Sequence, residues 1–203
     1  IPCKVPREIQ EVLGITRGLV PSLHLVDFSG LSLIEEVEVS DMCPYRVPIA
    51  GDVYGNFWVA DLLPFSKDWA PVYYVCHDPP VLVLQANSFE EFVAQLMDHS
   101  MKEPGGFIEQ VHENLAHKIY SENPNVVSFE NAIQLSGADS SLSEFAESLG
   151  KDFQFIDLRR ARIGDGFNWG RYGADTIVKR FGEERIFAYK KKPSGWLGKL
   201  FGK

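Results

Sequence analysis

Apolar residues recur at two spacings in the first half of the chain, and the two spacings alternate in blocks. Pro6–Leu13 begins with proline, carries apolar residues three and four positions apart and is followed by Gly14, which predicts a short helix. Leu31–Val39 is a strand-like apolar run with a change of phase at its paired glutamates, which predicts a bulged strand.

A tight hairpin is predicted at residues 52–56. Val47–Gly51 is short and apolar, and residues 57–62 form an aromatic and aliphatic run beyond a polar turn that contains glycine. Two more strands are predicted at residues 71–76 and 81–84, and the prolines between them cannot donate to a sheet ladder. Short turns between successive strands indicate antiparallel pairing.

A helix is predicted after these strands. Ser88 and Glu91 have the spacing of a capping box, and the following residues place an apolar face on one side of a helix: Phe89, Phe92, Val93, Leu96 and Met97. The order helix, strands, helix predicts an α+β fold over residues 1–100, with a mostly antiparallel central sheet flanked by helices.

The second half of the chain is predicted to be a C-terminal α+β extension over residues 101–189, packed on the same sheet. Its expected elements are a helix at 107–120, a second capping box at Ser141–Glu144 with a helix that ends at Gly150, strands at 152–158 and 185–190, and an aromatic-rich loop at 164–173. Residues 190–203 form a basic tail with five lysines.

Charge narrows the choice of partner. The 203 residues carry a formal net charge of −8, and residues 1–100 hold 14 acidic against five basic residues. Such a surface repels phosphate backbones, so nucleic acid is not an expected ligand. A cationic protein partner fits better, although acidity that serves only solubility is an equally good explanation of the charge.

No complete catalytic or cofactor-binding pattern is present, so we expect neither an enzyme nor a cofactor or metal. Cys3, Cys43 and Cys76 are widely separated and are expected to be reduced thiols of a cytoplasmic protein. His112 and His117 resemble the zinc-protease spacing with one residue too many, and five residues diverge by about 140° on an α-helix. We therefore expect both histidines at the surface of a helix.

Two alternatives remain open. One is an enzyme or ligand-binding protein with an anion site in the arginine-rich and glycine-rich second half, although nearby acids favour internal ion pairs; the candidate residues are Arg159, Arg162, Arg171 and Arg180. The other is a peripheral scaffold attached to a membrane surface or a partner's groove by the basic tail, through Trp196, Leu200 and Phe201.

Three segments carry a resemblance to a known family. Ala50–Asp61 has a glycine-polar-x-x-glycine turn followed by an aromatic strand that ends in aspartate, Ala70–Tyr74 resembles the next strand, and Asn87–Phe92 resembles a characteristic helix opening. Order and spacing resemble the SUKH superfamily, the SMI/KNR-type domain, over about residues 5–100. Residues 104–203 lie outside these motifs.

The resemblance implies a non-enzymatic α+β protein-binding module. Many bacterial members are thought to be immunity proteins that neutralise toxins, and fungal members are linked to cell-wall assembly. Tyrosine and tryptophan dominate interface energetics and acids steer cationic partners. The expected contact residues are therefore Asp52, Tyr54, Asn56, Trp58, Asp61, Asp68 and Trp69, with burial of Trp58 as the competing expectation.

Overall fold

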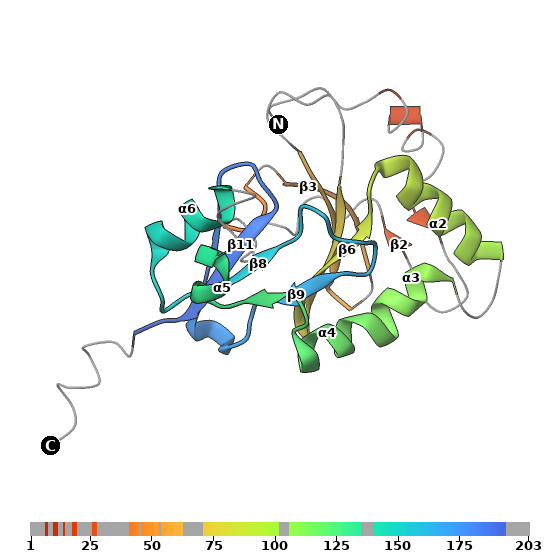
Figure 1. The fold of residues 1–203 in the computed structure, drawn as a ribbon. Helices are drawn as coiled ribbons and strands as arrows, with labels where there is room; N and C mark the ends of the chain where they lie inside the picture. Colours follow the sequence, from red (N-terminus) through yellow and green to blue (C-terminus); the bar gives the residue numbers. More distant parts are fainter. Residues whose placement is uncertain are drawn as a thin grey trace, which may run out of the picture.

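The structure is a computed structural model with two stacked sheets and helices on both outer faces (Figure 1). It describes residues 7, 10–11, 14, 18–19, 26–27, 41–44, 46–52, 54–62, 71–101, 106–134 and 140–193. The predicted strand at 31–39 lies outside these residues. Every strand pair among them is antiparallel, and the α+β class predicted from the sequence is confirmed.

The larger sheet, sheet A, contains all the described strands of the first half and one strand from the second. Its order is β1 (Gly18–Leu19), β2 (Val26–Asp27), β3 (Arg46–Gly51), β4 (Phe57–Asp61), β5 (Val72–His77), β6 (Pro80–Ala86) and β9 (Gly166–Asn168). The hairpin predicted between β3 and β4 is confirmed, and the two strands predicted at 71–76 and 81–84 are β5 and β6, which pair antiparallel.

Sheet B is built entirely from the second half. Its order is β10 (Thr176–Arg180), β11 (Ile186–Lys191), β8 (Gln154–Asp157) and β7 (Val126–Val127). The predicted closing strand is β11, and it extends to Lys191. Lys190 and Lys191, expected to begin the basic tail, therefore belong to the sheet, with the Lys190 ammonium 4.4 Å from the centre of the Phe153 ring.

The helices cover the outer faces of the two sheets. Sheet A carries α2 (Phe89–Met101) and a continuous helix made of α3 (Phe107–Glu109), the π-helical turn η3 (Gln110–Leu115) and α4 (Ala116–Glu122). Sheet B carries α5 (Phe129–Gln134) and α6 (Ser140–Leu149), and a short 3₁₀ turn, η5 (Gly173–Asp175), precedes β10.

Helix starts are only partly predictable from capping patterns. The Ser88 Oγ accepts a hydrogen bond from the Glu91 N–H at 3.1 Å, as predicted, but the Glu91 carboxylate accepts from the backbone of Asn87 at 2.8 Å rather than from Ser88. The second capping box is wrong: α6 starts at Ser140, and the Ser141 hydroxyl donates to Glu184 at 2.7 Å.

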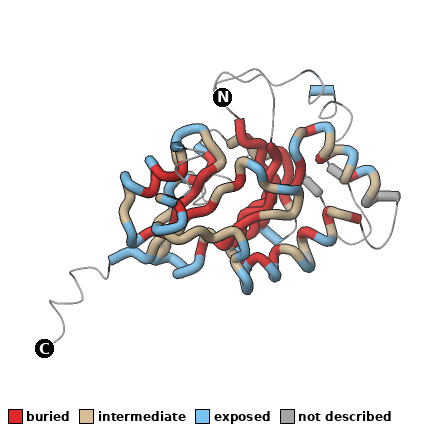
Figure 2. Tube along the Cα trace, in the orientation of Figure 1, coloured by how far each residue is buried: buried red, intermediate tan, exposed pale blue. Residues whose placement is uncertain are grey.

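Sheet A is buried on both faces, which Figure 2 shows as the red centre of the molecule. Along β4, Trp58 and Ala60 pack toward the helices, whereas Phe57 and Val59 pack toward sheet B. Trp58 is 1% exposed, and its indole N–H donates to the Gln85 side chain at 3.1 Å. The expectation that Trp58 contacts a partner is wrong, because no solvent-facing side of β4 exists.

Strand β9 was predicted as part of a loop, and its pairing requires glycine. A Cβ on Gly166 would lie 2.0 Å from the Leu82 carbonyl oxygen, so only glycine lets this backbone approach β6. Asn123, at the end of α4, accepts from the Asn168 N–H at 3.0 Å and donates to the Tyr189 hydroxyl at 2.7 Å. One helix end therefore holds β9 of sheet A beside β11 of sheet B.

A buried ion pair joins the two sheets. The carboxylate of Asp61 on β4 accepts a hydrogen bond from Arg180 Nη1 on β10 at 2.9 Å, and its other oxygen lies 2.8 Å from Nη2. The guanidinium, 3% exposed, also donates to the carbonyls of Met42, Glu183 and Glu184. Burial alone would lower the pKa of Arg180, but Asp61 outweighs it and raises the pKa, so the arginine stays charged.

We predict that Arg180→Met lowers the free energy of unfolding by about 3–5 kcal/mol, because it leaves the Asp61 carboxylate buried without a countercharge. The double variant Arg180→Met with Asp61→Leu should recover part of the lost unfolding free energy. The rest is not recovered, because the carbonyls of Met42, Glu183 and Glu184 still lack the donor that Arg180 supplied. Urea denaturation measures both variants.

The matched control is Lys179→Ala, one residue away on the same strand. Lys179 lies 3.9 Å from Asp41 with both side chains at least half exposed, so its loss costs less than about 1 kcal/mol. Equal losses for Lys179→Ala and Arg180→Met would contradict a stabilising role for the buried pair.

Candidate functional site

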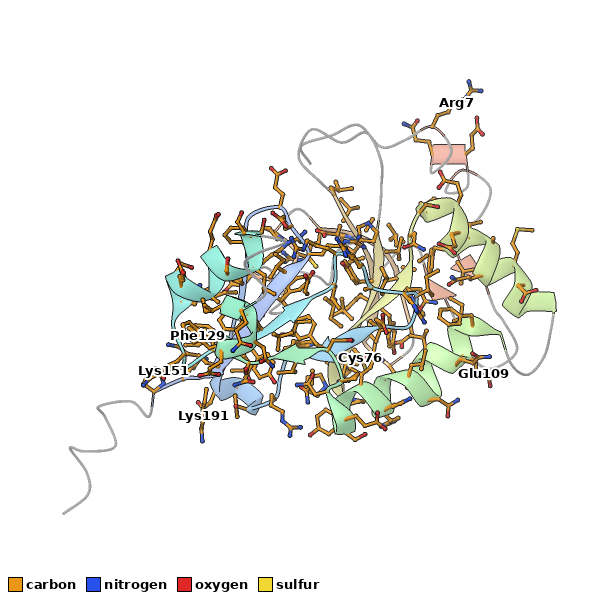
Figure 3. All side chains as sticks on the ribbon, in the orientation of Figure 1. Arg7, Cys76, Glu109, Phe129, Lys151 and Lys191 are labelled. Atoms are coloured by element: carbon orange, nitrogen blue, oxygen red, sulfur yellow. The ribbon has the colours of Figure 1, made fainter. Side chains whose placement is uncertain are left out.

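A pocket of about 390 Å³ opens between the β3–β4 turn, the end of β5 and the helix that follows α2. Its walls come from three places in the sequence, which the fold brings together: Tyr54 and Asn56 from the turn, Tyr74, Cys76, His77, Asp78 and Pro79 from β5 and the turn after it, and His112 and His117 from the helix. Figure 3 labels Cys76 at this end of β5.

The Asp52 carboxylate lies behind the pocket and holds its walls together. Its side chain is fully buried, and its Oδ1 accepts hydrogen bonds from the backbone N–H groups of Tyr54 and Asn56, both at 2.8 Å. Its Oδ2 accepts from the Asn56 side-chain amide at 2.8 Å and from the Tyr74 hydroxyl at 3.3 Å, and His112 Nε2 lies 3.2 Å away. The turn, the sheet and the helix therefore meet at one carboxylate.

These hydrogen bonds decide the charge of Asp52. Burial would raise its pKa, but the bonds from His112, Asn56 and Tyr54 outweigh burial and lower the pKa below its usual value. Asp52 is therefore ionised at neutral pH although its side chain has no access to solvent. Gly55, with φ of +85°, lets the turn close around it.

A π-helical turn brings the two histidines to the same pocket. The N–H of Ala116 bonds to the carbonyl of Val111, five residues back, so one turn of η3 closes at i+5 rather than i+4. His112 and His117 are five residues apart and both line the pocket. The expectation that they diverge is wrong, because it assumed α-helical geometry throughout.

The second histidine contact runs through Asn56. The Asn56 amide nitrogen donates to Asp52, so its oxygen is oriented toward His77, where it accepts from the backbone N–H at 3.1 Å and lies 2.9 Å from Nδ1. An amide oxygen only accepts hydrogen bonds, so Nδ1 of His77 carries the proton and Nε2 carries the lone pair in the neutral ring.

Aromatic rings form the wall above Asp52. The His112 ring centre lies 5.6 Å from that of Tyr54 and 5.8 Å from that of Tyr74. Tyr74 is buried, whereas Tyr54 is 55% exposed and forms the rim. The pocket therefore combines a buried negative charge with an exposed aromatic edge.

Cys76 does not have the environment of a nucleophile. The side chain is buried, and burial raises the pKa of its thiol, with a smaller contribution from the negative charges of Asp52 and Asp78. A thiol with a raised pKa is protonated at neutral pH, and the thiolate is the reactive form. Among the described residues, no group of three His, Cys, Asp or Glu side chains is arranged to hold a metal ion.

The structure gathers four of the seven predicted contact residues near one another, but most are not accessible. Asn56 lines the pocket as a buried group, Asp52 is buried behind it, Tyr54 is the exposed rim, and Trp58 is in the core. Asp61 faces the opposite side of sheet A, where Arg180 neutralises it, so its predicted role in a contact face is wrong. Asp68 and Trp69 lie outside the described residues.

The predicted anion site does not form. Arg159 contacts Asp157 at 2.6 Å and Glu184 at 2.9 Å, and Arg180 contacts Asp61, so the acids that accompany these arginines in the sequence are their partners in the fold. Arg162 and Arg171 are exposed. The tail residues Trp196, Leu200 and Phe201 lie outside the described residues. Across the part of the chain that the structure describes, no helix has the length and hydrophobicity to cross a bilayer.

The turn and strands that build the pocket lie within a region that matches a known family. Residues 1–95 match the model of the SMI1 / KNR4 family (SUKH-1). Residues 1–95 form a SUKH-1 domain. The resemblance noted in the sequence over about residues 5–100 is therefore confirmed. No curated protein and no solved structure matches the chain at the significance required.

The pocket is shared between the SUKH-1 domain and the segment after it. Asp52, Tyr54, Asn56, Tyr74 and His77 belong to the matched region, whereas His112 and His117 lie beyond residue 95. The sequence singled out both histidines but placed them on diverging faces of a helix, because nothing in their spacing marks the π-helical turn. His77 could have been noticed as the polar residue that ends a predicted strand.

We predict that Asp52→Asn lowers the free energy of unfolding at neutral pH by about 2–4 kcal/mol, because the buried acceptor loses its charge and part of its hydrogen bonding. The folded-state pKa of Asp52 is depressed, so its contribution is present above the unfolded-state pKa, about 3.9, and is lost as pH falls through the lower folded-state value. Urea denaturation from neutral pH to about pH 2.5 should show the two proteins converging at the acid end.

Asp78→Asn serves as the control, because this exposed carboxylate lies at the same pocket without the buried hydrogen bonds. A constant difference between the wild type and Asp52→Asn across that pH range would contradict the ionisation argument.

Proposed function

We propose that this chain is a non-enzymatic protein-binding module of the toxin-immunity type, which binds and neutralises a cationic protein. The observation that carries the proposal is the SUKH-1 match over residues 1–95, which includes the turn around Asp52 and the exposed Tyr54. SUKH domains are commonly immunity proteins.

The chemistry of the pocket supports binding rather than catalysis. Asp52 is enclosed by donors, Cys76 is buried with a raised thiol pKa, and Tyr74 is buried with its phenol pKa raised above the usual value by burial. None of these three groups is poised as a nucleophile or a general base near neutral pH. An exposed tyrosine beside a hollow is, by contrast, a common anchor of protein interfaces.

The charge distribution supports a cationic partner. A formal net charge of −8 attracts basic proteins over distances comparable to the Debye length and accelerates their association. The buried, unpaired thiols of Cys43 and Cys76 fit the reducing cytoplasm, where an immunity protein meets an incoming toxin, so we propose that location as well.

The proposal is tested by expressing this chain in a bacterial host together with the product of each gene adjacent to its own. We expect one product to inhibit growth by itself, to lose toxicity when this chain is present and to co-purify with it. Absence of both protection and co-purification for every adjacent product would overturn the proposal.

The same assay locates the contact surface. Tyr54→Ala should weaken co-purification by at least about fivefold, because interface tyrosines commonly contribute more than 1 kcal/mol. Tyr120→Ala is the matched control, since Tyr120 is similarly exposed at 43% but does not line the pocket. Equal affinities for the two variants would place the contact elsewhere on the chain.

A further inference from the structure

We propose that the pocket beneath Tyr54 receives one arginine or lysine side chain from the protein partner. This inference rests on the proposed function, which it deepens by naming the group that the pocket recognises. It is carried by four features of the pocket: its charge, its hydrogen-bond acceptors, its aromatic rim and its size.

The charge of the lining is suited to a cation. Asp78 supplies an exposed carboxylate that lines the pocket. The ionised Asp52 carboxylate lies behind two lining residues, Asn56 and Tyr74, and attracts a cation from there without contacting it. None of the described residues that line the pocket is lysine or arginine. Phosphate or carboxylate ligands would meet the same carboxylates and be repelled.

The hydrogen-bond network sets the polarity of the wall. Asp52 orients the Asn56 amide, and the Asn56 oxygen in turn requires the proton of His77 to sit on Nδ1. Nε2 of His77 then presents a lone pair, which accepts hydrogen bonds from a guanidinium or ammonium group. A buried carboxylate thus determines the tautomer of an exposed imidazole two hydrogen bonds away.

The aromatic rim supplies a further attraction to cations. The Tyr54 ring lines the pocket and lies 5.6 Å from the His112 ring, which supports it from behind. A cation over an exposed aromatic face gains about 0.5–1 kcal/mol, and more when it is desolvated. A volume of about 390 Å³ falls at the small end of ligand sites and suits one long side chain rather than a folded segment.

The test is an NMR titration of the full chain with Nα-acetyl-arginine amide, which has a guanidinium and no carboxylate. We expect shifts at Tyr54, Asn56 and His77, and no comparable shifts with the citrulline analogue, which has the same shape without the charge. Tyr54→Ala should weaken binding by about fivefold, whereas Tyr54→Phe, which keeps the ring, should bind like the wild type. Tyr120→Ala is the control for loss of an exposed ring outside the pocket.

The outcomes separate this inference from the proposed function. Equal shifts with the citrulline analogue, shifts spread over the acidic surface, or unchanged binding by Tyr54→Ala would each overturn the pocket's role as a cation site. Pocket binding of the arginine amide without any protective effect in the co-expression assay would support the cation site and contradict the immunity role. Protection that Tyr54→Ala leaves intact would support immunity and overturn the pocket as its contact.

Discussion

Burial of sheet A on both faces is the constraint from which the rest of the structure follows. A sheet with one solvated face alternates polar and apolar residues, but β4 and β5 are almost entirely buried, with helices on one side and sheet B on the other. Polar groups on these strands must therefore find partners inside the protein. Asp61 accepts a hydrogen bond from Arg180, Trp58 donates to Gln85, and Tyr74 donates to Asp52. Functional side chains are left to the ends of strands and to turns, which is where the pocket lies.

The same constraint explains what the sequence could and could not predict. The hairpins and the helix at α2 follow from local turn chemistry and apolar spacing, and both were predicted. The elements that pack on each face of the strands could not be predicted, because a continuous apolar run does not indicate which partner covers which face. Trp58 and Asp61 look like interface residues until their partners are placed against them: the helices, including Phe92 of α2, cover Trp58, and Arg180 of sheet B meets Asp61. Helices and sheet B together convert an apparent surface into an interior.

The π-helical turn marks a second limit of sequence reasoning. One hydrogen bond that closes at i+5 instead of i+4 brings His117 to the same pocket as His112. No residue in Gln110–Leu115 predicts this π-helical turn. Local propensity does not favour a π-turn, so it persists where tertiary contacts compensate for it, and such turns are frequent at functional sites. One such contact is that of His112 with the buried Asp52 carboxylate at 3.2 Å. The irregular helix and the buried charge are therefore two aspects of one arrangement.

The pocket is divided between the SUKH-1 domain and the segment that follows it. The turn, Asp52 and Tyr54 belong to the SUKH-1 domain, whereas the helix that completes the wall belongs to the extension, beyond the matched residues 1–95. Binding specificity is a difference of affinities set by the residues that vary around a common anchor. Under this argument the extension is part of the recognition surface, because without His112 and His117 the pocket would lose one of its three walls.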